Sequence, residues 1–195
     1  MYWIGEADFK LKAEFYLTFL KDAERILATN PNDQEGWSLK GVALVSLNNF
    51  MEGMKCFNIA LEINPRYTDA LYYKGNTYIK LLYFEDAIKC FNEILRINTY
   101  LTAARNNKGY CFAQLKQYEE ALKCLEHETK NRIYAPFYYN RACIQSLKQE
   151  IQPSFESLKC AIELDKQHYY MAVSDPDLDL LRHQPQFDEL KKLLS

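Results

Sequence analysis

The stretch DALYYKGNTYIKLLYFEDAIKCFNEILRI, residues 69–97, decides the fold that this sequence predicts. It contains two amphipathic helical patterns in succession, with Gly75 inside the first and Ala87 inside the second. A glycine inside a helix costs about 1 kcal/mol relative to alanine, and close contact with another helix is the usual compensation. Gly75 has counterparts at equal intervals before and after it, at Gly41 and Gly109. A fixed period of this size, about 34 residues, predicts a repeat architecture.

Each predicted repeat holds a second small residue twelve positions after the first. The four pairs are Gly41 with Gly53, Gly75 with Ala87, Gly109 with Ala121, and Ala142 with Ser154. Two helices joined by a short turn would cross at such a pair. Small side chains there let the two axes approach to the near end of the roughly 8–10 Å range. The sequence therefore predicts a series of closely packed helical hairpins.

The register divides the chain into six parts, which we expect to form one continuous domain. They are a degenerate N-terminal repeat or capping helix at 1–33, repeats at 34–67, 68–101 and 102–134, a repeat-like part at 135–168, and a C-terminal cap at 169–195. The first part would form one long helix or two short ones, with Trp3 and Ala7 as remnants of a first helix. In the last part, the run from Ser174 to Asp177 reads as a turn that also caps a short helix. The predicted class is all-α, with capping helices at both ends.

Composition and charge exclude several classes of protein. The 195 residues are 48% hydrophobic and 26% charged, which is typical of a folded chain. The formal net charge of −2 creates no global field that would attract nucleic acid or an anionic membrane. No signal peptide and no window of 18 apolar residues is visible in the sequence, so we expect a cytoplasmic protein without a membrane partner.

The cysteines and histidines form no recognisable site. Cys56, Cys90 and Cys124 recur at the repeat period, so matching positions on stacked repeats should lie roughly 10 Å apart, beyond disulfide reach. We interpret them as small buried apolar residues. No Cys-x-x-Cys motif, phosphate loop or nucleophile elbow is present in the sequence, and the histidines belong to no catalytic motif. We therefore expect no metal, no cofactor and no catalytic residue.

The period and its signature residues resemble the tetratricopeptide repeat, a helix–turn–helix unit of about 34 residues. The first full repeat carries Trp37, Gly41, Phe57, Ala60 and Pro65, the second Gly75, Tyr78, Ala87 and Phe91, and the third Gly109, Tyr118 and Ala121. The resemblance covers residues 34–168 well and 1–33 weakly. It implies an α-α superhelix whose concave groove is lined by the first helix of each repeat and binds segments of partner proteins.

The groove positions of that family, carried onto this sequence, give the candidate partner-binding residues. They are Tyr72, Asn76, Asn106, Asn107, Tyr110, Tyr139 and Asn140. Asparagine can both donate to and accept from a peptide backbone, and tyrosine adds apolar area with a polar tip. The competing interpretation is that some of these tyrosines simply pack between repeats.

A better-defined subclass of the family binds the C-terminal carboxylate of chaperones through lysines and asparagines. Asn76 and Asn107 match its asparagines, but Tyr72, Pro136 and Asn140 stand where its basic residues would be. A buried carboxylate needs charge-assisted donors, so the sequence disfavours this subclass.

We expect a non-catalytic scaffold or adaptor that binds a protein or peptide partner in the groove, as a monomer or weak homo-oligomer. Lysines and arginines are scattered among acids, which disfavours nucleic acid. The alternative is a self-assembling structural subunit that stacks through its end repeats, with Tyr2, Trp3 and Phe9 as the seam.

Overall fold

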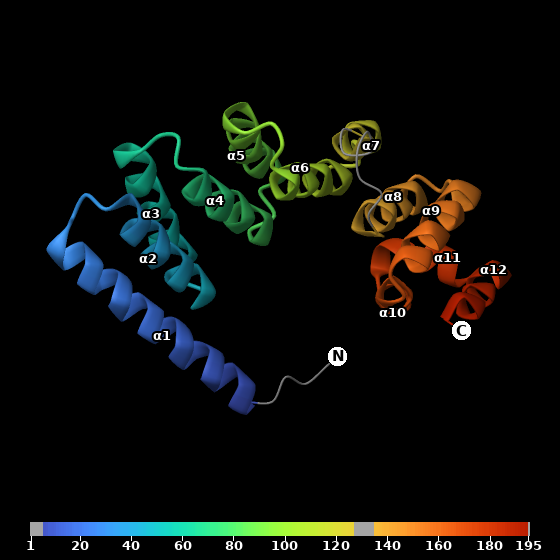
Figure 1. Ribbon diagram of the computed structural model, residues 1–195, viewed down its shortest axis with the longest axis horizontal. Helices are drawn as coiled ribbons and strands as arrows, with labels where there is room; N and C mark the ends of the chain where they lie inside the picture. The colour runs from blue at the N-terminus through green and yellow to red at the C-terminus, as the bar shows by residue number, and fades with distance from the viewer. Residues whose placement is uncertain (1–5, 127–134, 195) are drawn as a thin grey trace. The chain divides into compact units, whose positions relative to one another are not determined.

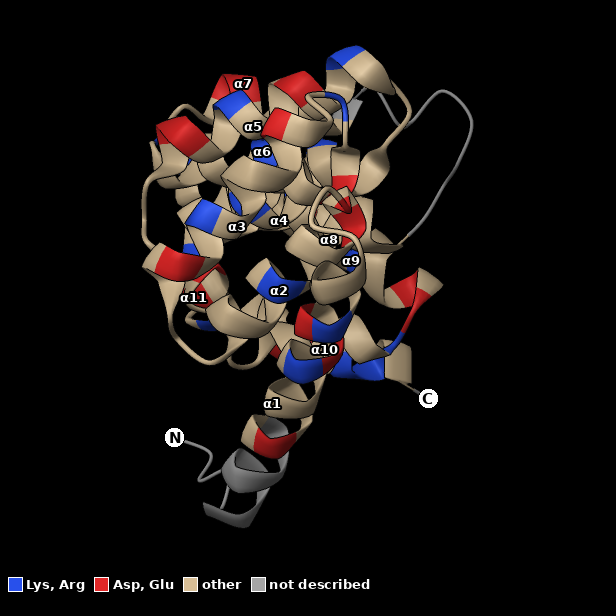
Figure 2. Cartoon of the chain, turned by 90° about the vertical axis from the view of Figure 1, so that its left-hand side faces the viewer, with Lys and Arg blue, Asp and Glu red and all other residues tan. Residues whose placement is uncertain are grey.

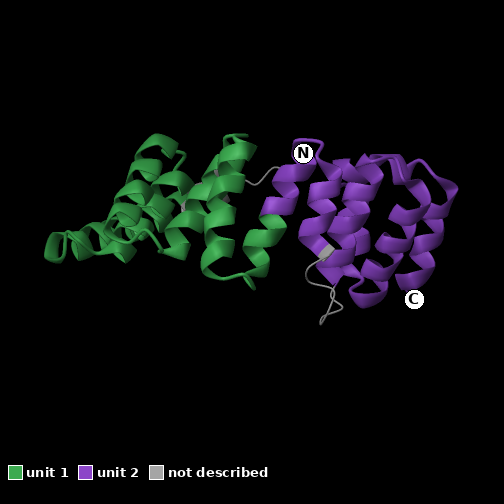
Figure 3. Cartoon of the chain, turned by 90° about the horizontal axis from the view of Figure 1, so that it is seen from above, with its two compact units in different colours: residues 1–107 green, residues 108–195 purple. Residues whose placement is uncertain are grey.

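The computed structural model describes the backbone of residues 6–126 and 135–194 and the side chains of 13–125 and 135–194. All regular structure within these ranges is helical, which confirms the predicted all-α class. The residues group into two compact units, 1–107 and 108–195, and each is described by itself (Figure 3). The predicted division into six parts of one continuous domain stays a prediction.

Unit 1 consists of antiparallel helical hairpins joined by short turns (Figure 1). Its helices are α1 (Glu6–Thr29), α2 (Gln34–Ser46), α3 (Phe50–Ile63), α4 (Thr68–Lys80), α5 (Phe84–Ile97) and the first part of α6 (Thr102–Gln114). The helices α2 and α3 form one hairpin, α4 and α5 form the next, and α3 packs against α4. Phe57 and Phe91, one in the second helix of each hairpin, are fully buried.

Unit 2 contains one complete hairpin followed by shorter helices. Its elements after α6 are α7 (Tyr118–Glu126), α8 (Ala135–Leu147), α9 (Ile151–Leu164), α10 (Gln167–Ala172), η1 (Pro176–Leu178), α11 (Asp179–Arg182), α12 (Pro185–Glu189) and η2 (Leu190–Leu194). The short helices from α10 onward, here named the C-terminal cap, pack on α8 and α9. Leu178 and Leu181 of the cap are fully buried against that hairpin.

Helix α1 is longer than the other described helices. The described residues contain no separate helix before it that could pair with it as α2 pairs with α3. Residues 16–29 of α1 are in register with α3 and α5, and the helix continues N-terminally to Glu6. It packs against α2 through a face that includes buried Ala23. Phe15 stacks on Phe19 at 5.9 Å and is 61% exposed. Tyr2, Trp3 and the side chains of Ala7 and Phe9, assigned above to a first helix or a seam, lie outside the described residues.

In unit 1, the predicted small pairs mark the points at which two helices touch. A Cβ atom added to Gly41 would lie 2.5 Å from Cε1 of Phe57. One added to Gly53 would lie 2.5 Å from Cγ2 of Val45 and 2.9 Å from the carbonyl oxygen of Gly41. These distances are well inside van der Waals contact, so hydrogen is the side chain that fits at these two positions without displacing a neighbour.

The corresponding pair in unit 2 is joined by a hydrogen bond. Ser154 Oγ donates to the carbonyl oxygen of Ala142 at 2.6 Å. One turn further along, Ser157 Oγ donates to Gln145 Oε1 at 2.7 Å. The α8–α9 hairpin is therefore close enough for hydroxyl-to-backbone contact across the crossing.

The tight turn inside each hairpin contains one residue with a left-handed backbone. These residues are Asn48, Leu82, Lys116 and Gln149, with φ between 59° and 65°. After each of them the chain closes a helix-ending bond, as when Asn49 N–H donates to the carbonyl oxygen of Leu44 at 2.8 Å. Asparagine tolerates this conformation, whereas a leucine is strained in it. Leu82 is also 71% exposed, so its side chain gains little from packing.

The six cysteines are free thiols, and all except Cys160 are buried. Burial raises the pKa of Cys90 to about 11 and that of Cys111 to about 12, so both remain protonated near neutral pH. This confirms the interpretation of the repeating cysteines as small buried residues. No helix among the described residues is both long enough and apolar enough to cross a membrane.

We predict that Gly41→Ala destabilises the chain by about 2 kcal/mol, although alanine is the better helix former. The added methyl group meets the ring of Phe57, which is fully buried. Urea unfolding followed by circular dichroism measures the change. The matched control is Gly109→Ala, where the nearest atom would be 3.3 Å away and the expected loss is under about 0.5 kcal/mol. Equal losses at the two sites would contradict the close crossing at Gly41.

We predict that Leu82→Gly stabilises the chain by about 1 kcal/mol, because glycine removes the strain of the left-handed backbone. The thermal unfolding midpoint checks this, with Asn48→Gly as the control that should change it less. A lower midpoint for Leu82→Gly would show that the leucine side chain makes a stabilising contact.

Candidate functional site

Three of the predicted binding residues meet in unit 1, on the face formed by α4 and the start of α6. Asn107 Nδ2 donates to Asn76 Oδ1 at 2.7 Å and lies 3.4 Å from the hydroxyl oxygen of Tyr72. All three side chains are half-buried. We name this group the amide cluster. Its contacts link the first helices of two successive hairpins.

The amide cluster keeps part of its hydrogen-bonding capacity. The contacts of the described residues use one acceptor of Asn76 and the amide nitrogen of Asn107. Within those contacts, the Asn76 NH₂ group and the Tyr72 O–H remain as donors, and Asn107 Oδ1 remains as an acceptor. The cluster can therefore give and receive hydrogen bonds at the same time, as a peptide bond does.

Aromatic contacts hold the ring of Tyr72 in place. It lies edge-on to Phe91, with the ring centroids 6.2 Å apart, and edge-on to Tyr73 at 5.9 Å. Such pairs favour this geometry, and Phe91 is fully buried. The hydroxyl of Tyr72 is therefore presented by a ring with little freedom to rotate. Asn106, the fourth predicted residue of this unit, precedes Asn107 on α6 and is half-buried.

Unit 2 places the other three predicted residues in different environments. Tyr110, on α6, is 45% exposed, and burial, followed by the charge of Asp177, raises its pKa. Asn140, on α8, is half-buried. Tyr139 is only 4% exposed, and its O–H donates to Asp175 Oδ2 at 2.7 Å. Burial, followed by that hydrogen bond, raises the pKa of Tyr139.

The tyrosines at 72 and 139 share a structural role. Each is the fifth residue of its helix, α4 or α8. The hydroxyl of Tyr72 meets Asn107 on the next first helix, and that of Tyr139 meets Asp175 in the cap. The cap thus supplies a hydrogen-bond partner for Tyr139, as the next first helix does for Tyr72. This contact favours the packing interpretation for the hydroxyl of Tyr139.

The contact between Asp175 and α8 was not predicted from the sequence. The predicted turn and cap are present, since Asp175 Oδ1 accepts from the N–H of Asp177 at 3.0 Å and caps η1. Arg182 holds the turn by donating to the carbonyl oxygens of Ala172 and Asp175. Side-chain atoms of Cys143, Asp175 and Asp177 lie within 4.8 Å of one another. Burial, followed by the charge of Asp175, raises the pKa of Asp177. The repeat pattern gave no signal for this contact, because Asp175 lies in the tail, one residue beyond the register position of Asn107.

The exposed surface of each of the second helices α3, α5 and α7 carries an ion pair. Lys55 pairs with Glu52, Lys89 with Asp86 and Lys123 with Glu120, at 2.7, 2.7 and 2.6 Å. These pairs recur at the repeat period, and Figure 2 shows acidic and basic residues side by side on the helices. The second helices α3, α5 and α7 therefore present no stripe of one charge.

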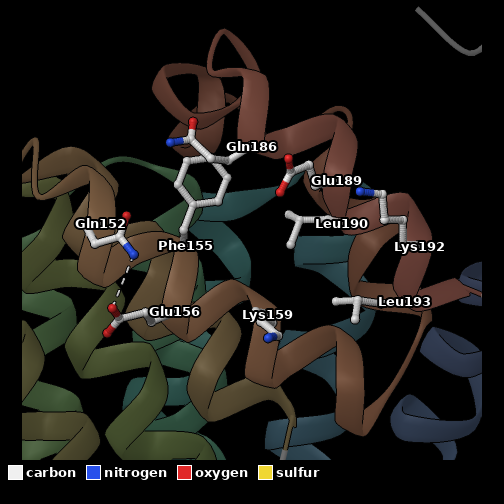
Figure 4. Close-up of a pocket in the computed structure, with 9 residues that line it drawn as sticks. All are labelled: Gln152, Phe155, Glu156, Lys159, Gln186, Glu189, Leu190, Lys192 and Leu193. Atoms are coloured by element: carbon white, nitrogen blue, oxygen red, sulfur yellow. Dashed lines mark hydrogen bonds between the residues drawn. The ribbon is translucent and has the colours of Figure 1, made fainter.

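A pocket of about 410 Å³ lies between α9 and the last two helices of the cap (Figure 4). Phe155, Leu190 and Leu193 form its apolar part. Glu156, Lys159, Glu189 and Lys192 also line it, so both signs of charge surround the opening. None of the seven predicted binding residues lines this pocket.

We predict that Tyr139→Phe destabilises the chain by about 1.5–3 kcal/mol, because it removes the O–H donor from Oδ2 of the half-buried Asp175 carboxylate. Urea unfolding measures the loss. Tyr72→Phe is the matched control and should cost less than about 1 kcal/mol, since its hydroxyl contact is the longer one. A loss for Tyr139→Phe no larger than that for Tyr72→Phe would contradict the role given to Asp175.

Comparison with known proteins supports the repeat interpretation. The sequence profile of the tetratricopeptide repeat family matches residues 68–99 and 102–127. These segments correspond to the α4–α5 hairpin and to the region of α6 and α7. No curated protein matches the sequence.

Solved structures share the fold at low sequence identity. PilW, a type IV pilus biogenesis factor, is 17% identical with a TM-score of 0.73, over 95% of this chain and 91% of its own. YrrB, described as a TPR protein with an unusual peptide-binding site, is 16% identical with a TM-score of 0.65, over 88% of each chain. A TPR protein of Thermus thermophilus is 18% identical with a TM-score of 0.64, over 92% and 90%.

At these identities the likeness concerns the fold alone, and it confirms the predicted α-α solenoid of stacked helix–turn–helix repeats. The matched profile, the fixed repeat period and the close crossings at small pairs agree with one another. The chain therefore contains tetratricopeptide repeats, matched over residues 68–99 and 102–127.

Proposed function

We propose that this chain is a non-catalytic interaction scaffold that binds a partner polypeptide on the face of its first helices. The observation that carries the proposal is the amide cluster of Tyr72, Asn76 and Asn107. Its side chains are half-buried and bonded to one another, and they keep two donor groups and one acceptor group within the described contacts. Polar groups placed in this way suit a ligand that offers both carbonyl oxygens and N–H groups.

A polypeptide backbone is the ligand that fits this chemistry best. A side-chain amide can exchange two hydrogen bonds with one peptide unit without recognising any particular side chain. Each such bond contributes about 0.5–1.5 kcal/mol net, so several are needed for useful affinity. The ring of Tyr72 supplies apolar contact beside them. Asn106 precedes Asn107 on α6, and we include it in the proposed site of unit 1 as a fourth residue of the same face.

In unit 2 the proposed contact residues are Tyr110 and Asn140, with Tyr139 as their support. Tyr110 is the most exposed of the three, and its ring offers apolar area. The hydroxyl of Tyr139 is already bonded to Asp175, so we assign this residue to holding α8 and the cap together.

We propose no catalytic role. The two described histidines, His168 and His183, each place Nδ1 near a backbone carbonyl oxygen, and neither is paired with a nucleophile among the described contacts. His127 lies outside the described residues. YrrB, a TPR protein with an unusual peptide-binding site, shares the fold, which supports a peptide partner for this chain as well. An adaptor role in the cytoplasm is part of the same proposal.

We predict that a Tyr72→Ala, Asn76→Ala, Asn107→Ala variant loses a protein partner that the wild-type chain captures from a native lysate. Mass spectrometry of the two pull-downs measures the difference. Three hydrogen-bonding side chains are removed, so captured partner should fall about tenfold or more, which corresponds to about 1.4 kcal/mol. Circular dichroism confirms that the variant is folded.

The control variant carries Asn58→Ala and Tyr83→Ala, which remove the same residue types from exposed positions on or beside second helices. It should retain the partner. Retention by both variants would move the site away from the first helices. Recovery of the chain alone would favour the alternative of self-assembly, for which the exposed Phe15 of α1 supplies apolar surface.

A further inference from the structure

We draw no further inference here: the strongest candidate, the cluster of Cys143, Asp175 and Asp177 between α8 and the C-terminal cap, is accounted for by the bond of Asp175 to Tyr139 and its capping of η1, and no second observation among the described residues points to a bound cation.

Discussion

The close crossing of two helices at a pair of small residues is the constraint on which the rest of this structure depends. At Gly41 the ring of Phe57 lies where a side chain would otherwise stand, and at Gly53 the carbonyl oxygen of Gly41 does. Because the two helices meet there, each helix turns its large apolar residues toward the other helix. The opposite face of the first helix then becomes the place where polar side chains such as Asn76 can be held partly buried.

The crossing also explains why so much of the fold could be predicted from one sequence. A contact that repeats in space demands the same small residues at the same spacing, so the period is visible in the chain itself. The constraint has a visible limit at α1. The position in register with Gly53 is occupied by Phe19, and there the chain continues as one long helix. A bulky residue at the crossing leaves no room for a first helix to pack closely, and the remnant assigned to Ala7 belongs to the same helix.

The candidate site could be predicted only in part. The helix positions of Asn76 and Asn107 follow from the period, but their hydrogen bond depends on the distance between α4 and α6. The bond of Tyr139 to Asp175 was not predicted because Asp175 lies in the tail, where the period is lost. Arg105 has a third kind of contact that could not be predicted from the sequence. It stands in the slot of Trp37, and each donates to a carbonyl oxygen six residues earlier, of Thr99 and Pro31 respectively. Positions 37 and 105 are two repeat periods apart, which follows from the sequence, while the shared donor role required coordinates.

The most direct test of the central claim is hydrogen–deuterium exchange of the full chain with and without the partner that it captures. Protection reports which backbone segments a bound polypeptide covers or rigidifies. We expect added protection in residues 68–80 and 102–107, the elements that carry the amide cluster. We expect little change in α3 and α5, whose exposed faces carry ion pairs. Added protection confined to those second helices, or to the C-terminal cap, would contradict the claim.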